Sequence, residues 1–395
     1  MADLLVIADD LTGACDTGVK FAEAGLLTEI LVHPNVDLES VDPSVQVIVA
    51  DTESRHVAPA EAAARVEHVA AEGIRAGARH FYKKTDSTLR GNVGAELDAL
   101  MRAADAQFLA FAPAFPEAGR ATIGGCQHVD GVPIHESAFA ADPLAPVTSS
   151  SVAEIIARQC ARLVTIVAPG EPLPDTGIAV FDAETDADLT RIAQRLAREG
   201  RLQFTAGSGG FAGPVARSLG LARARIAGIS ARGPMLILSG SLQEVALRQV
   251  RHAIGAGVAA RRVTMACDVG DVAESAGGLL WDGRDVLLYT AGESAHVQAG
   301  ASQALSRKIG AIAERIIRRP GGTGSVAVFG GETAAATLAA LGASRIWPHR
   351  ELWPGVVEAS LRLGDRDVGL ITKSGGFGPE DIVTRLIERT NREER

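Results

Sequence analysis

Residues 83–92 read Lys83-Lys84-Thr85-Asp86-Ser87-Thr88-Leu89-Arg90-Gly91-Asn92, a stretch that combines three cations, one carboxylate and three hydroxyl groups. The preceding His80-Phe81-Tyr82 is typical of a short strand, whereas residues 93–103 have the apolar spacing of a helix that begins near Asn92. The stretch is therefore predicted to be a strand-to-helix loop. In an open α/β sheet, ligands bind beyond the carboxyl ends of the strands, and a helix N-terminus favours an anion. We expect an anionic ligand here; the alternative is a solvated charged turn.

The chain around this loop alternates between apolar runs and helix-like runs. Leu4–Ala8 is wholly apolar, as a buried parallel strand should be, and the helix after it is expected to end at Ala24, before Gly25. Further strand-like and helix-like runs follow in alternation, which predicts a doubly wound α/β sheet with mainly parallel strands. Three successive strands end in polar residues, at Asp9 and Asp10, at Arg55, and at Lys83 to Arg90.

The length of 395 residues exceeds what one hydrophobic core usually supports, so two domains are expected. Residues 1–225 form the first predicted domain and residues 233–395 the second, with a connection at 220–233. Asp130-Gly131, between two strand-like runs of the first domain, predicts a β-hairpin. The predicted fold class is thus α/β, with two doubly wound domains, mainly parallel sheets and an active-site cleft between the domains.

The composition of the chain argues against a membrane protein, an exported protein and a nucleic-acid-binding protein. Hydrophobic residues make up 47% of the chain without a membrane-length run, and Met1-Ala2-Asp3 carries no basic export signal, so a cytoplasmic protein is expected. The net charge of −9 argues against nucleic acid or an anionic membrane as partner. The four cysteines form no CxxC pair and the nine histidines show no ligand spacing, so we predict neither a zinc site nor a disulfide framework.

The carboxylates Asp9 and Asp10 have two interpretations. Asp10 could cap the following helix, a structural role that needs one carboxylate only. The second carboxylate favours a functional role, in which the pair accepts substrate hydroxyls, binds Mg²⁺ or acts as a general base. Asp16 and Lys20, four residues apart, fit a surface ion pair.

Cations are expected to face these carboxylates from the neighbouring strand ends. With Arg55, Lys84 and Arg90 opposite Asp10 and Asp86, the first domain would have a pocket for a small molecule that carries a carboxylate at one end and hydroxyls along its body. A planar guanidinium suits that carboxylate, because it can donate two parallel hydrogen bonds.

Three strand ends of the second domain carry glycine loops: Ser239-Gly240-Ser241, Gly330-Gly331-Glu332-Thr333 and Lys373-Ser374-Gly375-Gly376-Phe377-Gly378. Glycine lets a backbone approach phosphate closely, and a following helix offers N–H donors. None of the loops matches the Walker A or GxGxxG pattern, and each alone could be a simple turn. Together they favour a nucleotide site, whose candidate residues are Ser239, Gly240, Ser241, Gly330, Gly331, Glu332, Thr333, Gly375 and Gly376.

Four motifs together resemble the four-carbon acid sugar kinase family: Asp9-Asp10-Leu11-Thr12-Gly13-Ala14, residues 83–92, residues 330–333 and residues 373–378. They occur in that order over nearly the whole chain. The resemblance implies an N-terminal sugar-acid-binding domain, a C-terminal ATP-binding domain, and phosphoryl transfer to a hydroxyl of a tetronate such as threonate, erythronate or 3-oxo-tetronate. Residues 131–136 with Asp142-Pro143 resemble the threonate or erythronate branch more than the oxo-tetronate branch.

The resemblance also implies roles for single residues. Carried over by motif, the substrate side comprises Asp10, Arg55, Lys84, Asp86, Ser87 and Arg90, beside Asp9, and the ATP side comprises Ser239, Gly330 to Thr333 and Gly375. We therefore predict an ATP- and Mg²⁺-dependent kinase that could form a homodimer. Asp10 or Asp86 is the expected general base, and the metal ligands are left open.

Three other functions fit parts of the sequence. Residues 10–16 are similar to the D-x-x-G-A-G-D motif of ribokinase-like sugar kinases, but that motif lies late in the chain of those enzymes. A haloacid-dehalogenase-like phosphatase needs carboxylates two positions apart, and Leu11 stands at the second position. A non-catalytic sugar-acid sensor would need no ATP loops.

Overall fold

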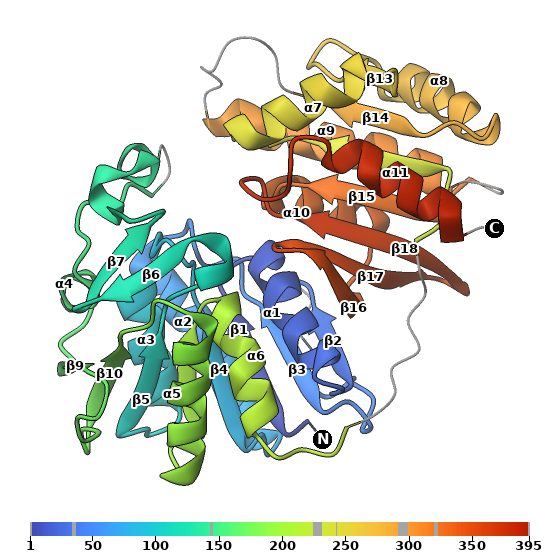
Figure 1. Ribbon diagram of the computed structural model, residues 1–395. Coiled ribbons are helices and arrows are strands. Elements are labelled where there is room, and N and C mark those ends of the chain that lie inside the picture. The colour runs from blue at the N-terminus through green and yellow to red at the C-terminus, as the bar shows by residue number, and fades with distance from the viewer. Residues whose placement is uncertain are drawn as a thin grey trace. The chain divides into compact units, whose positions relative to one another are not determined.

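The computed structural model describes residues 2–33, 37–142, 145–223, 231–241, 243–290, 299–319 and 323–393 (Figure 1). Its helices are α1 (Leu11–Glu23), α2 (Pro59–Arg75), α3 (Val93–Ala103), α4 (Val152–Ala157), α5 (Asp186–Arg198), α6 (Gly209–Ser218), α7 (Glu244–Gly255), α8 (Val269–Trp281), α9 (Ala299–Ile317), α10 (Gly331–Leu341) and α11 (Ile382–Glu393). None of the helices in these ranges is long and apolar enough to cross a membrane.

The strands are β1 (Leu4–Ala8), β2 (Thr28–Leu31), β3 (Val47–Asp51), β4 (His80–Lys84), β5 (Phe108–Ala112), β6 (Arg120–Ile123), β7 (Cys126–Val129), β8 (Val132–Pro133), β9 (Val164–Val167), β10 (Gly177–Phe181), β11 (Phe204–Gly207), β12 (Met235–Ser239), β13 (Ala259–Arg262), β14 (Val286–Tyr289), β15 (Ser325–Phe329), β16 (Arg345–Trp353), β17 (Val356–Leu363) and β18 (Arg366–Lys373). Strands and helices alternate as the sequence predicts, and β1 has the predicted bounds.

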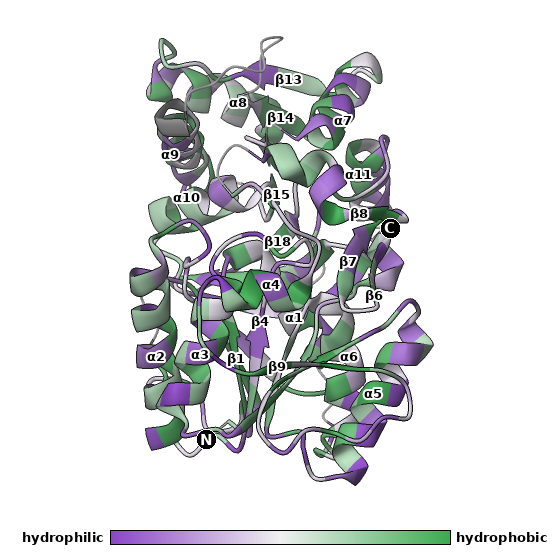
Figure 2. Cartoon of the chain, turned by 90° about the vertical axis from the view of Figure 1, so that its left-hand side faces the viewer, coloured by the Kyte–Doolittle hydropathy of each residue, from purple (hydrophilic) through white to green (hydrophobic). Residues whose placement is uncertain are grey.

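The residue types account for these elements. β1 is apolar and buried throughout. On α5, Leu189, Ile192 and Leu196 are buried at spacings of three and four residues, as on an amphipathic helix. β4 differs because it ends in Lys83 and Lys84, and it is the purple strand at the centre of Figure 2. An apolar strand would be expected at this position, so the two buried lysines at its end indicate a role other than apolar packing.

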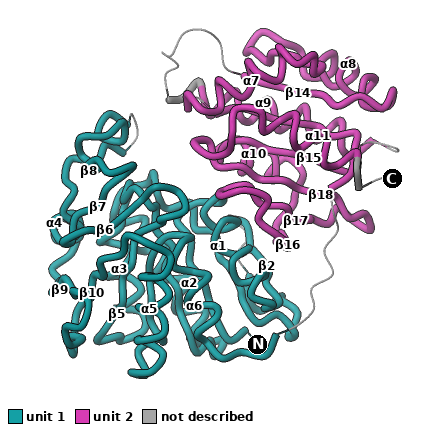
Figure 3. Tube along the Cα trace, in the orientation of Figure 1, with its two compact units in different colours: residues 1–226 teal, residues 227–395 magenta. Residues whose placement is uncertain are grey.

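The chain divides into two compact units, Met1–Ile226 and Ala227–Arg395 (Figure 3). Half of the predicted connection at 220–233, residues 224–230, lies outside the described residues. The active-site cleft expected between the domains stays a prediction.

The sheet of the first unit has the strand order β2-β3-β1-β4-β11-β5-β10-β9, and all its pairings are parallel. Helices α2 and α3 pack together on one face, whereas α6 packs with α1 and α5 on the other (Figure 2). Helices on both faces make this sheet doubly wound, so the predicted fold class is confirmed.

The predicted hairpin is also confirmed. Asp130 and Gly131 adopt φ angles of 49° and 80°, the left-handed values that a two-residue primed turn requires. They connect β7 to β8, and β6 completes a small antiparallel sheet in the order β6-β7-β8.

The sheet of the second unit has the order β13-β14-β12-β15-β18-β17-β16. The pairings from β13 to β18 are parallel, and β17 and β16 continue the sheet antiparallel. In this unit α8, β13, β16 and β17 are missing from the sequence-based prediction, as β6 and α4 are in the first unit. β13 reads Ala-Ala-Arg-Arg at the sheet edge and is not buried, so it lacks the apolar pattern by which strands are predicted.

Candidate functional site

Three polar strand ends of the first unit meet at one edge of the sheet. β1 lies between β3 and β4, and Ala8 is in register with Asp51 on one side and Lys84 on the other. Because the three strands are parallel, the residues that follow them emerge side by side. The structure therefore brings together the three predicted polar segments.

Arg55 joins two of these segments. Its Nε lies 2.7 Å from Asp9 Oδ2, and its Nη1 and Nη2 lie 2.8 and 2.7 Å from the two carboxylate oxygens of Asp10. Burial alone would raise the pKa of Asp9, but the charge of Arg55, followed by those of Lys84 and Lys83, lowers it to about 2. Asp9 is therefore held as an anion, and Arg55 fixes the positions of both carboxylates.

Asp10 has the structural role that the sequence suggests. It is the N-cap of α1, and its Oδ1 accepts a hydrogen bond of 2.9 Å from the Gly13 N–H. The cap and the Arg55 contact occur together, so Asp10 fixes both the start of the helix and the orientation of the guanidinium. Asp16 on the same helix is buried, so its expected place in a surface pair is wrong.

Asp86 and Arg90 form the second charged group of the site. Arg90 Nε lies 2.7 Å from Asp86 Oδ2, and its Nη1 lies 3.0 Å from Asp142 Oδ2. Burial opposes ionisation of Asp86, yet Arg90 and then Arg55 hold its pKa well below the usual range. Gln127 on β7 donates to the Ser87 carbonyl over 2.8 Å, which ties the small sheet to the same loop.

The two lysines that end β4 have different environments. Lys83 is fully buried and forms an ion pair of 2.8 Å with Glu96 on α3, so its role is structural. Lys84 is 4% exposed and makes no ion pair or hydrogen bond with the described part of the chain. A β-carbon added at Gly13 would lie 2.8 Å from Lys84 Nζ, which places the ammonium over the first turn of α1.

Asn92 occupies the predicted N-cap position of α3, but its side chain does not cap the helix. Its Nδ2 donates instead to the carbonyl oxygens of Ser54 and Val57, each over 2.9 Å. Asn92 therefore fixes the segment that follows β3 against the loop that follows β4.

Glu53 belongs to the site, although no role is predicted for it from the sequence. Its Oε1 accepts a hydrogen bond of 3.3 Å from the Leu11 N–H, and its φ angle of 44° is unusual for a residue other than glycine. Burial, followed by the charge of Asp10, raises its pKa to about 7. The only sequence signal is its place in the polar run that ends β3.

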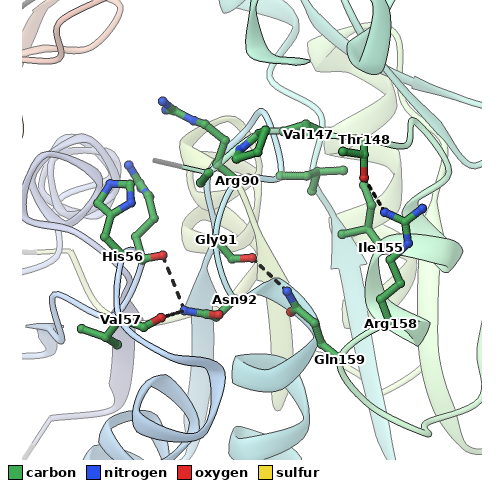
Figure 4. Close-up of a pocket in the computed structure, with 14 residues that line it drawn as sticks. His56, Val57, Arg90, Gly91, Asn92, Val147, Thr148, Ile155, Arg158 and Gln159 are labelled. Carbon is green, nitrogen blue, oxygen red and sulfur yellow. Dashed lines mark hydrogen bonds between the residues drawn. The ribbon is translucent and has the colours of Figure 1, made fainter. Parts of the chain in front are cut away.

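A cavity of about 270 Å³ opens beside Arg55 and Arg90 (Figure 4). His56 also lines it, and its pKa is lowered by burial and then by Arg55 and Arg90. Arg158 and Gln159, which follow α4, close another side, and Gln159 donates to the Gly91 carbonyl over 3.0 Å. The other predicted substrate residues, Asp9, Asp10, Lys84, Asp86 and Ser87, do not line this cavity.

The three glycine loops of the second unit follow neighbouring strands, β12, β15 and β18, and they contact one another. A β-carbon on Gly240 would collide with Thr333 Oγ1. A β-carbon on Gly375 would lie 2.5 Å from Ser241 Oγ, and one on Gly330, whose φ is 101°, would lie 3.2 Å from Ser241 Cβ. Glycine is therefore needed at these positions for the loops to meet.

Within the described ranges, no cluster of three or more His, Cys, Asp or Glu side chains could hold a metal ion. The cysteines are free, with Cys15 buried and the other three partly exposed.

Two family models match the chain. A sugar-binding N-terminal domain matches residues 4–215, and a nucleotide-binding C-terminal domain matches residues 236–383. A D-threonate kinase of Bordetella bronchiseptica is 34% identical over 97% of this chain and 96% of its own. The chain belongs to the four-carbon acid sugar kinase family.

Other relatives of this kinase family have similar coverage. A D-threonate kinase of Salmonella typhimurium is 32% identical over 96% of both chains. A 3-oxo-tetronate kinase of Cupriavidus necator is 30% identical over 97% of this chain and 96% of its own. The family resemblance of the four motifs is thus confirmed.

Solved structures agree on the fold of the family. A Haemophilus influenzae protein, 24% identical, covers 98% of this chain and 100% of its own with a TM-score of 0.74. A Bordetella bronchiseptica protein, 31% identical over 99% of both chains, has a TM-score of 0.50, and its crystal structure is a domain-swapped dimer with bound citrate.

Proposed function

We propose that this family member is an ATP-dependent kinase that phosphorylates a hydroxyl group of a four-carbon sugar acid of the threonate or erythronate type. The observation that carries the proposal is Lys84, a buried cation whose charge acts on Asp9 but which makes no hydrogen bond or ion pair with the described part of its unit. A buried charge is costly unless it is paired, so an anion from outside would stabilise it. The match of a sugar-binding family model to this unit and the names of the relatives support the same substrate class.

The acid would bind with its carboxylate toward Lys84 at the N-terminus of α1, where the positive end of the helix dipole also favours an anion. Asp9 Oδ1 is buried and accepts no hydrogen bond from the described residues, so it is an available acceptor for a substrate hydroxyl. The citrate bound to the Bordetella relative supports a carboxylate ligand in this family.

Asp10 and Asp86 are our proposed contacts to the reacting hydroxyl. Each is held by an arginine, which suits positioning. For Asp86 the lowered pKa also disfavours proton abstraction, because a carboxylate stabilised as an anion is a weak base. Glu53, whose pKa is raised to about 7, lies near Asp10 and has the proton affinity that suits a general base at neutral pH. In phosphoryl transfer, positioning and charge stabilisation supply most of the catalysis.

ATP would bind at the three glycine loops of the second unit, through Ser239, Gly240, Ser241, Gly330, Gly331, Thr333, Gly375 and Gly376. Mg²⁺ commonly binds through one or two carboxylates together with the phosphates of the nucleotide. Glu332, on the first turn of α10, is the carboxylate of these loops and could be a ligand of Mg²⁺. Its side chain accepts a hydrogen bond of 2.8 Å from Ser302. The metal would neutralise charge on the transferred phosphate.

The experiment that tests the proposal is a coupled ADP assay with purified protein and a panel of threonate, erythronate and 3-oxo-tetronate isomers. We expect ADP to form only when a tetronate is present. Phosphate release from a tetronate phosphate without ATP would support a phosphatase instead. Tetronate binding without turnover in the presence of ATP and Mg²⁺ would support a sensor.

Arg90→Lys should be far from conservative. Lysine cannot hold Asp86 through two nitrogens while also contacting Asp142, so the loop loses its geometry. We expect the loss in kcat/KM for the acid to correspond to about 2–4 kcal/mol. Arg195→Lys on α5 is the matched control, and kinetics of Arg90→Lys equal to that control would remove Arg90 from the site.

We further propose a cytoplasmic location and a homodimer. The domain-swapped dimer of the Bordetella relative supports the homodimer. Light scattering coupled to size-exclusion chromatography measures the mass directly, and the mass of a single chain at micromolar concentration would exclude a stable dimer.

A further inference from the structure

Lys373 is the last residue of β18. Its side chain is fully buried, a position at which an apolar residue is more common than lysine. No carboxylate of the described ranges pairs with it. Its Nζ donates to the carbonyl oxygens of Ser374 (3.0 Å), Gly375 (3.3 Å) and Phe377 (3.1 Å) and lies 4.8 Å from the centre of the Phe329 ring. The loop that follows β18 is therefore wrapped around a cation.

A second buried donor holds the far end of the same loop. Gln249 on α7 is fully buried, and its Nε2 lies 3.0 Å from each of the carbonyl oxygens of Phe377, Gly378 and Pro379. The carbonyl groups of this loop thus converge on two side chains in the interior of the unit.

The inward carbonyl groups determine where the N–H groups point. In a trans peptide, C=O and N–H point in opposite directions. The carbonyls of Ser374, Gly375 and Phe377 face Lys373, so the N–H groups of Gly375, Gly376 and Gly378 point away from it. None of these three N–H groups donates a hydrogen bond to the described residues. Free N–H groups that follow one another in a loop form a concave site for an anion.

The charge of Lys373 would strengthen this arrangement. Burial lowers its pKa to about 7, whereas the three carbonyl oxygens favour the protonated form. A protonated amine has three N–H bonds, one for each carbonyl, and its positive charge lies behind the peptide groups whose N–H ends face outward. An apolar side chain of the same length would fill the space but would leave three carbonyls without a donor.

We propose that Lys373 is a positioning residue of the nucleotide site, which orders residues 374–378 so that the N–H groups of Gly375, Gly376 and Gly378 bind a phosphate of the nucleotide. The inference rests on the proposed function for the identity of the anion. The loop is joined to the other glycine loops, because Gly330 donates to the Lys373 carbonyl over 2.8 Å and Gly375 lies against Ser241.

Lys373→Met tests the proposal, because methionine keeps the length and removes the charge. The variant leaves three carbonyl groups without their donor, so we expect some loss of stability, and the Tm of the variant is measured alongside binding. We expect ADP binding, measured by calorimetry, to weaken roughly tenfold or more, with KM for ATP rising in parallel and KM for the sugar acid unchanged. Lys308→Met on α9 is the control, because among the described residues Lys308 donates to the Met265 carbonyl alone.

The outcomes are separable. ADP binding by Lys373→Met equal to that of Lys308→Met would overturn the inference and leave the kinase proposal intact. Equal increases in KM for both substrates together with a lower Tm would indicate a purely structural role and would also overturn it. Wild-type protein that binds no ADP would overturn the proposed function and the inference with it.

A second measurement covers the case in which Lys373→Met does not fold. Glycine-selective ¹⁵N labelling of the full chain lets the amide resonances of Gly375, Gly376 and Gly378 be followed during an ADP titration. We expect all three to shift. Unmoved resonances at saturating ADP would contradict the proposed phosphate contact.

Discussion

Lys84→Met should lower kcat/KM for the sugar acid by about 2–4 kcal/mol, or roughly 30- to 1,000-fold, because a desolvated contact to the anionic substrate is lost. Lys84 makes no hydrogen bond or ion pair with the described residues, so its removal takes a nearby positive charge from Asp9 but no hydrogen-bond donor from any carboxylate. The free energy of unfolding should therefore fall less than in Arg55→Met. The kinetic loss should appear mainly in KM for the acid and should leave KM for ATP unchanged.

Lys20→Met is the matched control for this prediction. Lys20 lies in the same unit, on α1, and its Nζ is 3.8 Å from the exposed Glu117 carboxylate, a contact of small energy. If both variants keep wild-type kinetics, Lys84 does not contact the substrate. The burial of Lys84 would then no longer support the proposed function.

Arg55→Met should produce the largest loss of stability. The Arg55 side chain is 9% exposed and is bonded to Asp9 and Asp10 at 2.7–2.8 Å, and its removal leaves the buried Asp9 and the partly buried Asp10 without that partner. Breaking a buried ion pair on one side costs about 3–5 kcal/mol of the free energy of unfolding. Arg191→Met on α5, where the arginine is exposed, is the control and should cost less than about 1 kcal/mol. Urea denaturation measures both, and equal midpoints would refute the prediction.

The pH dependence of stability should change in the same variant. The pKa of Asp9 is lowered from 3.8 to about 2 in the folded protein, so its ion pair stabilises the fold above pH 3.8 and that contribution is lost as the pH falls toward 2. Without Arg55 the folded-state pKa of Asp9 should rise, because burial then dominates. Acid unfolding of Arg55→Met should therefore begin at a higher pH than that of the wild type. An unchanged acid midpoint would show that Arg55 does not stabilise the Asp9 anion.

Much of this architecture could be predicted because buried strands and capped helices leave strong local patterns. Leu4–Ala8 is apolar without interruption, and Gly25 and Asp130-Gly131 have the backbone angles that their residue types suggest. The polar residues after β1, β3 and β4 meet because the strands are parallel neighbours, which the alternation of strands and helices already implies.

Other features depend on contacts that no local pattern encodes. Arg55 bonds to carboxylates 45 and 46 positions away, and the sequence shows only that these charges exist. Arg158 and Gln159 reach the cavity from the short helix α4, whose six residues give no clear periodicity. The raised pKa of Glu53 follows from burial beside Asp10, which is a property of the folded chain alone.

The burial of Lys83, Lys84 and Lys373 also determines how the protein should respond to amine-directed reagents. The chain has only five lysines, and these three are at most 4% exposed. An acylating reagent must reach the nitrogen atom, so the buried lysines nearest the proposed site should not react. This holds even for Lys373, whose pKa of about 7 would otherwise make the amine a good nucleophile. Labelling or immobilisation through amines should therefore fall on Lys20, Lys308 and the N-terminus and leave the proposed substrate and nucleotide contacts unmodified.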